Sequence, residues 1–112
     1  MDSDRIAELI ESGNTGDFTS KRSWFADTFQ LHIPTWGINY STADEALPGL
    51  SQLFHDNEIA QTTSRVEEHG VFVISFNTVT SNTRREPIET VNVYRLEGDL
   101  VAEGWVLSPP AG

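Results

Sequence analysis

The hydrophobic positions of this chain change from helical spacing to alternation at about residue 28. Near the N-terminus, Ile6, Leu9 and Ile10 form one stripe of a short helix. A second helix is expected to begin at Asp17, which is a good N-cap residue. From residue 28 to residue 33 apolar and polar side chains alternate, which predicts a short strand that ends at a proline.

A third helix is predicted after residue 41. Thr42 is followed three residues later by Glu45, which is the spacing of a capping box. Pro48 interrupts the apolar stripe that follows, so we expect either a kinked helix or a short one that restarts at this proline. The intervening residues 35–41 have no clear period and are expected to form a loop.

The remainder of the chain is strand-like. Strands are predicted over residues 59–67 and 71–80, and a long hairpin is predicted over residues 86–107 with a tight turn near Gly98. In the first strand of the hairpin Asn92 and Tyr94 share a face, and in its second strand one face carries Glu103, Trp105 and Leu107.

Composition narrows the class of protein. The chain has 112 residues, which suits a single domain spanning residues 1–112, and no cysteine. Its net charge of −10 argues against nucleic acid and anionic membranes as partners. No segment resembles a signal peptide or a membrane span, and we therefore expect a soluble, cytoplasmic protein.

The order of elements predicts the fold class. Helices come first and mostly antiparallel strands follow, which is typical of an α+β domain. A long curved antiparallel sheet that wraps around such helices leaves a hollow between the two layers. The predicted architecture therefore contains a pocket.

Three segments in this order resemble the nuclear-transport-factor-2-like superfamily, in its SnoaL-like and ketosteroid-isomerase-like branch. They are residues 24–34 (WFADTFQLHIP), residues 45–50 (EALPGL) and residues 93–105 (VYRLEGDLVAEGW). The resemblance implies a cone-shaped sheet that closes over the N-terminal helices, an apolar cavity at the open end of the cone, and homodimers formed through the sheet.

The site residues of ketosteroid isomerases carry over only in part. The position of the catalytic base, just before the proline of the first strand, is Ile33, and the first helix has no tyrosine. The position of the protonated aspartic acid corresponds to Asn92, whose amide still donates hydrogen bonds. Steroid isomerisation is therefore not expected. The polyketide-cyclase-like members place an acid or base on the late strands, where Glu103 lies.

These considerations give three candidate catalytic residues. Glu103 would be the general acid or base; the alternative is a structural carboxylate that pairs with Arg95 or another basic group across the hairpin. Asn92 would hold a substrate oxygen, or it satisfies neighbouring backbone groups. His32 would shuttle a proton, or it is a histidine at the rim of the core. The resemblance implies that Asn92 and Glu103 face the same pocket.

A further set of residues is expected to form the apolar walls around a ligand, namely Trp36, Tyr40, Tyr94, Trp105 and Leu107. The histidines lack metal-ligand spacing, so neither a metal nor a cofactor is expected. A valine surface on the strands, formed by Val71, Val73, Val79, Val91 and Val93, would need a partner, which favours a homodimer through the sheet.

Two functions fit these observations. The first is an enzyme that isomerises, cyclises or dehydrates a small apolar compound with a carbonyl group, using Glu103 to move the proton. The second is a non-catalytic module of the same fold that binds a small apolar ligand or serves for dimerisation. The first predicts that Glu103→Gln abolishes turnover, whereas the second predicts that Glu103→Gln leaves ligand affinity largely intact and that Trp36→Ala or Trp105→Ala weakens it.

Overall fold

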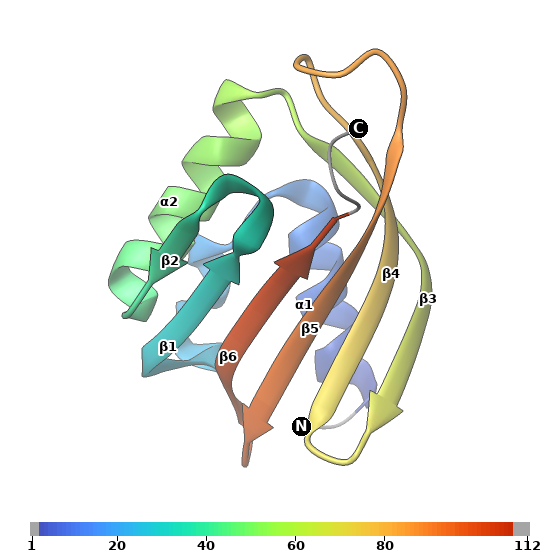
Figure 1. The fold of residues 1–112 in the computed structure, drawn as a ribbon. Helices are drawn as coiled ribbons and strands as arrows, with labels where there is room; N and C mark the ends of the chain where they lie inside the picture. Colours follow the sequence, from blue (N-terminus) through green and yellow to red (C-terminus); the bar gives the residue numbers. More distant parts are fainter. Residues whose placement is uncertain (1–2, 109–112) are drawn as a thin grey trace.

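A computed structural model describes residues 3–108 as two α-helices, two 3₁₀ turns and one six-stranded sheet (Figure 1). The helices are α1 (Ser3–Thr15) and α2 (Ala43–Asp56), and the 3₁₀ turns span Thr19–Trp24 and Pro34–Trp36. The strands are β1 (Phe25–Ile33), β2 (Ile38–Tyr40), β3 (Ala60–His69), β4 (Phe72–Thr80), β5 (Ile88–Glu97) and β6 (Leu100–Leu107).

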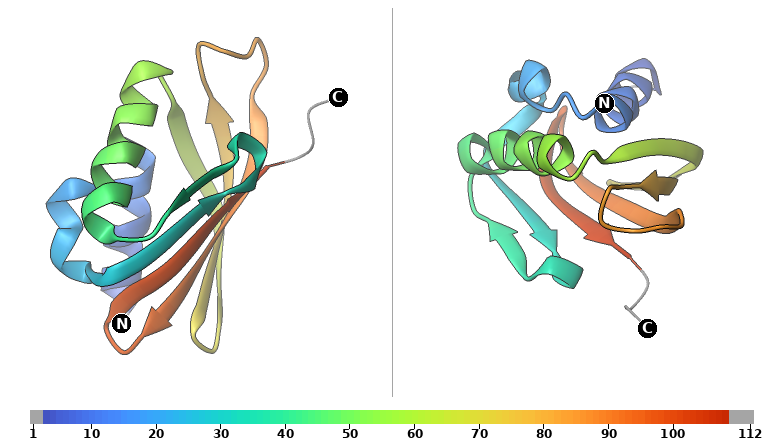
Figure 2. Two further views of the ribbon diagram at one scale, coloured as in Figure 1. Left: turned by 60° about the vertical axis from the view of Figure 1, so that its left-hand side comes forward. Right: turned by 90° about the horizontal axis from the view of Figure 1, so that it is seen from above.

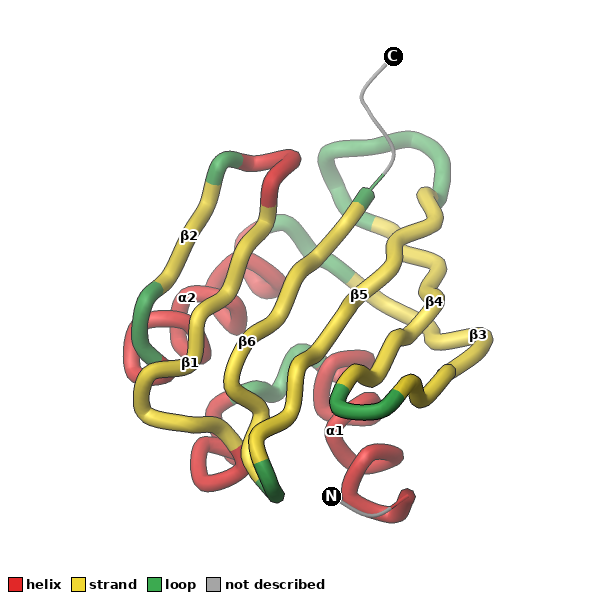
Figure 3. Tube along the Cα trace, turned by 60° about the horizontal axis from the view of Figure 1, so that its bottom comes forward, coloured by secondary structure: helices red, strands yellow, loops and turns green. Residues whose placement is uncertain are grey.

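The strands lie in the order β2-β1-β6-β5-β4-β3 (Figure 3). Neighbouring strands are antiparallel except β1 and β6, which run parallel, so the sheet is mixed. The sheet curves without closing, and α1 and α2 cover one of its faces (Figure 2). We call this the helix-facing side and the opposite, uncovered side the open face. The predicted α+β class and curved sheet are confirmed.

Three local predictions differ from the structure. The second helix is only a 3₁₀ turn, and β1 begins at Phe25 instead of residue 28. The expected loop at residues 35–41 contains a 3₁₀ turn and the short strand β2, which extends the sheet beside β1. The helix α2 neither restarts nor breaks at Pro48, which lies inside it.

The helix α2 begins as predicted and positions the larger part of the core. The Thr42 side chain accepts a hydrogen bond from the backbone N–H of Glu45 at 3.3 Å, as a capping residue does. One stripe of α2, which includes Ala46 and Leu47, is buried against the helix-facing residues of β1. The helix α1 packs further along the sheet, where Ile6 and Ile10 cluster with Val73 of β4.

The pairing of β5 with β6 contains an irregularity that decides which side chains face the helices. Leu96 lies opposite Val101, but the next residue of β5, Arg95, lies opposite Glu103. Ala102 is therefore an extra residue, a β-bulge in β6. Because strand side chains alternate, this extra residue exchanges the two faces for everything that follows it in β6.

Candidate functional site

A cavity of about 120 Å³ lies between the helices and the sheet. Its walls are mainly apolar side chains from both layers, including Phe18, Phe25, Phe29, Leu31, Leu47, Leu50, Leu53, Phe54, Ile88 and Val106. Among the described residues that line it, Arg84 is the only charged one, and it lies in the loop between β4 and β5. Within residues 3–108, no aspartate, glutamate, histidine or lysine belongs to the lining.

A cluster of neutral polar side chains interrupts the apolar wall on the sheet side. Gln61 of β3, Thr90 and Asn92 of β5, and Tyr94 of the same strand all line the cavity. Asn92 donates from Nδ2 to Gln61 Oε1 and to Tyr94 Oη, at 3.4 Å in each case. Gln61 in turn donates to Oδ1 of Asn14 in α1 at 3.3 Å, so the cluster joins a helix to the sheet.

Two atoms of this cluster retain hydrogen-bonding capacity. Asn92 is 5% exposed, and its Oδ1 has no hydrogen-bond partner among the described residues. The Tyr94 hydroxyl accepts from Asn92, and within residues 3–108 it donates to no acceptor. Burial raises the pKa of Tyr94, and the hydrogen bond from Asn92 opposes this. The hydroxyl therefore stays protonated at neutral pH and is available as a donor.

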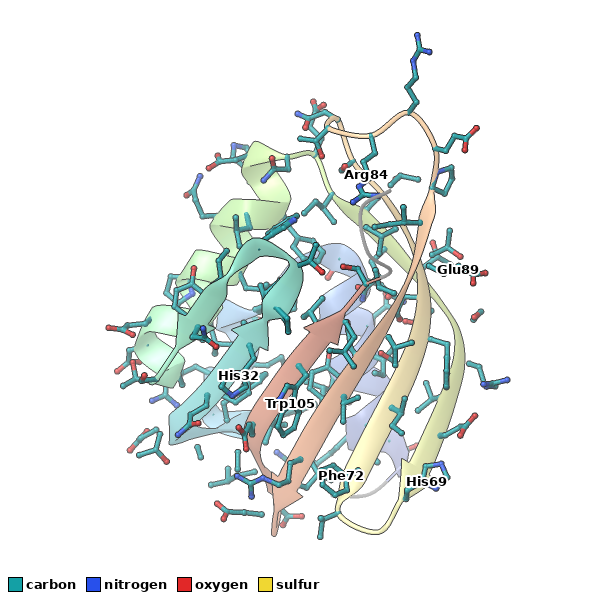
Figure 4. The ribbon with its side chains drawn as sticks, in the orientation of Figure 1. His32, His69, Phe72, Arg84, Glu89 and Trp105 are labelled. Carbon is teal, nitrogen blue, oxygen red and sulfur yellow. The ribbon has the colours of Figure 1, made fainter. Side chains whose placement is uncertain are left out.

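The open face carries a separate, ionic cluster. His32 Nε2 lies 2.8 Å from Glu103 Oε2, and His32 Nδ1 lies 2.7 Å from Asn39 Oδ1. Arg95 Nε contacts the other carboxylate oxygen of Glu103 at 3.4 Å. The Trp105 ring lies beside His32, with 5.7 Å between the ring centroids, and Figure 4 shows both side chains on the uncovered side of the sheet.

The contacts of His32 favour its charged form. The hydrogen bond to Asn39, and then the hydrogen bond and charge of Glu103, raise the pKa of His32 above its ordinary 6.5, while burial lowers it. Both ring nitrogens face oxygen acceptors, and only the imidazolium ion donates from both. The cluster therefore consists of His32, the Arg95 guanidinium and the Glu103 carboxylate that both contact, and these contacts favour the imidazolium form of His32.

The three candidate catalytic residues do not meet at one cavity. Asn92 lies opposite Val106 and lines the cavity, whereas Glu103 lies opposite Arg95 and points to the open face. The expectation that Asn92 and Glu103 share a pocket-facing side is therefore wrong, because the bulge at Ala102 turns Glu103 away. His32 does meet Glu103, but on the open face.

The residues predicted to surround a ligand are also divided. Trp36, Tyr94 and Trp105 line the cavity, although the Trp105 ring also lies next to His32. Tyr40 is not among the lining residues, and its ring packs over Gly49 of α2, where an added Cβ would lie 2.7 Å from Tyr40 Cζ. Leu107 is 41% exposed and is likewise outside the lining.

The predicted valine surface is smaller than expected. Val91 and Val93 lie on the open face, paired with Leu107 and Trp105. Val73 instead packs against α1 and Val79 lines the cavity, so both belong to the helix-facing side. Val71 precedes β4 and lies at the β3–β4 turn.

The neutral polar cluster at the cavity was largely not predicted from the sequence. Gln61 and Thr90 were not singled out, because a glutamine or threonine in a polar strand is usually solvated. A usable signal was the alternation in β5, which places Thr90, Asn92 and Tyr94 together on one face.

Two further properties concern residues 3–108. No helix in that range has both the length and the apolar character required to cross a membrane. No three histidine, aspartate or glutamate side chains in the same range come together as a metal site.

Comparison with known proteins identifies the fold. No protein-family model matches the chain, and no curated protein matches it. Among solved structures it is similar to a candidate ketosteroid isomerase from Kribbella flavida, with a TM-score of 0.80 at 13% identity over 96% of this chain and 76% of the other. A candidate polyketide cyclase from Sinorhizobium meliloti gives a TM-score of 0.79 at 10% identity, over 92% and 93% of the two chains.

A third structure points to the same fold. It is an NTF2-like protein of unknown function from Cytophaga hutchinsonii, which gives a TM-score of 0.74 at 16% identity over 94% of this chain and 87% of the other. At such identities the similarity establishes how the chain folds and leaves its activity open.

Proposed function

We propose that this chain, which has the nuclear-transport-factor-2-like fold, binds a small apolar molecule in the cavity between its helices and its sheet. The observation that carries the proposal is the composition of the cavity wall. Apolar side chains surround one group of neutral hydrogen-bonding side chains, which is the usual composition of a site for a small organic ligand.

The volume limits the size of the ligand. An apolar cavity of roughly 150 Å³ accommodates benzene. The cavity of about 120 Å³ therefore suits a group of about the size of one ring, and a larger molecule would extend out of the mouth beside Trp36.

The polar cluster defines where an oxygen atom of the ligand would lie. The Tyr94 hydroxyl has a proton to donate, so a carbonyl or hydroxyl oxygen of the ligand would accept it. Asn92 Oδ1 lacks a donor, which a ligand hydroxyl would supply. Satisfying such buried groups favours a ligand with one polar atom over a pure hydrocarbon.

The composition of the cavity wall disfavours the alternative hypothesis of a proton-transfer enzyme that uses Glu103 and His32. General acid–base catalysis needs a titrating group within hydrogen-bond reach of the substrate. The carboxylate and the imidazole that we assigned to this role face the open side of the sheet. The proposal therefore favours ligand binding and gives Glu103 and His32 no role toward a molecule in the cavity.

The test is a titration with phenylpropanol, followed by the fluorescence of the tryptophans, of which Trp36 lines the cavity. We expect saturable binding that Tyr94→Phe weakens about fivefold, since one neutral hydrogen bond is lost. Tyr40→Phe is the matched control, because Tyr40 lies outside the lining. Glu103→Gln should leave the affinity within about twofold, because a residue behind the sheet makes no contact with the ligand.

Two results would overturn the proposal. One is the absence of binding for phenylpropanol together with the absence of any retained small molecule in native mass spectrometry. The other is a larger loss of affinity in Glu103→Gln than in Tyr94→Phe. The second result would bring the proton-transfer enzyme back into consideration.

The homodimer through the sheet stays a proposal. The uncovered surface available for it includes the partly buried Val91, Val93 and Trp105 and the exposed Leu107 and Phe72, with the His32–Glu103 pair among them. A second copy would remove this apolar surface from water.

A further inference from the structure

Among the charged residues that the structure describes, Arg84 differs in position, because it alone lines the cavity. It lies in the loop that joins β4 to β5, and Figure 4 shows its side chain turned inward from that loop. Its neighbour Arg85 is, like Arg84, an exposed residue, but it is not part of the lining. Two adjacent arginines thus differ in whether they reach the cavity.

No acidic side chain neutralises Arg84 within residues 3–108. Other arginines have partners there: Arg22 pairs with Asp27 at 2.7 Å, and Arg65 pairs with Glu67 at 2.9 Å. Arg84 forms no ion pair or hydrogen bond with any side chain in that range. Its guanidinium group is therefore available to a ligand.

Hydrogen bonds attach the loop of Arg84 to the end of α2. The backbone N–H of Asn82 donates to the carbonyl of Asn57 at 2.9 Å, and Asn82 Nδ2 donates to the carbonyl of Asp56 at 3.5 Å. Within the loop the hydroxyls of Ser81 and Thr83 lie 2.9 Å apart. These contacts attach the base of the loop to the end of α2, beside the cavity that Ser81, Thr83 and Arg84 line.

We propose that the ligand of this cavity is a small amphipathic monocarboxylate, with its apolar body inside and its carboxylate on Arg84. This inference rests on the proposed function and names the class of ligand. A guanidinium group matches a carboxylate in shape and forms paired, charge-assisted hydrogen bonds with it. The other described lining residues are neutral, so the site can neutralise only one negative charge of a ligand.

The overall charge of the protein disfavours a ligand with more than one negative charge. The chain carries a net charge of −10, which opposes the approach of anions. At about 0.15 M salt these distant charges are screened beyond roughly 8 Å, so Arg84 dominates at the mouth. A phosphate monoester, with a charge of about −1.5 to −2 at neutral pH, would be left partly uncompensated by one arginine.

The experiment compares acids with the matching alcohols by isothermal titration calorimetry at low ionic strength. The acids are benzoate, phenylacetate and phenylpropionate, and the alcohols are benzyl alcohol, phenylethanol and phenylpropanol. The chain length at which the acid gains most over its alcohol reports the distance from the cavity to Arg84. We expect a gain of about fivefold for that acid, since an exposed ion pair contributes no more than this.

The arginine variants assign the gain to one side chain. Arg84→Gln should remove the preference for the acid, so that the acid and its matching alcohol bind with about equal affinity. Arg85→Gln, which alters the same net charge in the same loop, should retain the preference. Added salt should reduce the preference in the wild type and have no such effect in Arg84→Gln.

The outcomes separate this inference from the proposed function. If alcohols and acids bind with equal affinity, or if Arg85→Gln loses the preference as fully as Arg84→Gln, the carboxylate assignment is overturned while the binding cavity stands. If neither series binds, the proposed function fails and this inference fails with it. An acid preference confined to proteins that retain Arg84 supports both.

Discussion

The two sides of the sheet use polar residues in opposite ways. On the helix-facing side the polar side chains that the strands contribute to the cavity are neutral, and Asn92 and Tyr94 are among them. On the open face the central polar cluster is built around a carboxylate, because Glu103 links His32 to Arg95. Neutral groups can be buried beside a cavity at modest cost, whereas charged groups need partners and contact with water.

The separation of these two sites depends on one extra residue. If β5 and β6 paired regularly beyond Leu96 and Val101, Glu103 would lie opposite Tyr94 and would face the cavity. The bulge at Ala102 instead brings Glu103 opposite Arg95. A single residue in a hairpin thus decides whether the cavity of this chain contains a carboxylate, and with it whether acid–base chemistry is available there.

The largest predicted effect comes from adding a carboxylate on the helix-facing side of the sheet. Gly104 follows Glu103 and faces the helices, where an added Cβ would lie 3.4 Å from Phe29 Cζ and 3.5 Å from Leu31 Cδ1. Gly104→Asp should lower the free energy of unfolding by about 3–5 kcal/mol, because the charge is buried without a partner. Urea denaturation monitored by circular dichroism measures this loss.

The matched control is Gly104→Ala, which adds only the Cβ. Its contacts with Phe29 and Leu31 are ordinary van der Waals distances, so the change in stability should stay within about 1 kcal/mol. If the aspartate variant were as stable as the alanine variant, residue 104 would face water, and the assignment of the two sides would be wrong.

A second prediction tests what covers the open face. Val93 lies in the middle of this face, paired with Trp105 on one side and with Ile74 on the other. If a second copy covers it, Val93→Lys places an unpaired charge in the contact and should raise the dissociation constant of the dimer by about 100-fold or more. Sedimentation velocity at micromolar concentration follows the change from dimer to monomer.

Val71→Lys is the control for that experiment. Val71 is 54% exposed at the turn before β4, outside the paired region, so its substitution should leave the dimer intact. A wild-type protein that sediments as a monomer under these conditions would contradict the dimer. Dissociation in Val71→Lys with a dimer retained in Val93→Lys would place the contact elsewhere.

A smaller effect is predicted for the pH dependence of stability. The pKa of His32 is raised in the folded protein, so its contribution is fully present below the unfolded value of 6.5 and is lost as the pH rises through the folded value. The contribution should be about 1 kcal/mol or less, because the side chains are 25% and 21% exposed and partly screened. Denaturation of the wild type and of His32→Gln from about pH 6 to about pH 9 measures it.

The His69–Glu67 pair of β3 provides a comparison, because it also lies on the open face. His69 also contacts a glutamate, with 2.9 Å between its Nε2 and Glu67 Oε1, but its side chain is 60% exposed. His69→Gln should therefore lower the free energy of unfolding less than His32→Gln. An equal change in the two variants would show that the His32–Glu103 pair has no special stabilising role.

The architecture could be predicted from the sequence because it follows from repeating patterns. The stripe of α2, the capping threonine at position 42 and the alternation in β4 and β5 are each supported by many residues. The strand β2 was missed because it has only three residues and depends on pairing with β1. Its short segment has no periodicity of its own.

The candidate site was less predictable because it depends on register. Alternation correctly grouped Glu103 with Trp105 and Asn92 with Tyr94, but it cannot relate one strand to the next. That relation was set by the bulge at Ala102, a small residue with no sequence signal for a bulge. The result was a correct hairpin with a carboxylate assigned to the wrong side.

The most direct test of the two-sided account is a heteronuclear NMR titration with phenylpropanol that follows two side-chain amides. Asn92 lines the cavity, and Asn39 contacts His32 on the open face. The account predicts that the amide signals of Asn92 shift in a saturable manner while those of Asn39 stay in place. Shifts at Asn39 without shifts at Asn92 would show that the ligand binds on the open face, and would contradict binding in the cavity between the helices and the sheet.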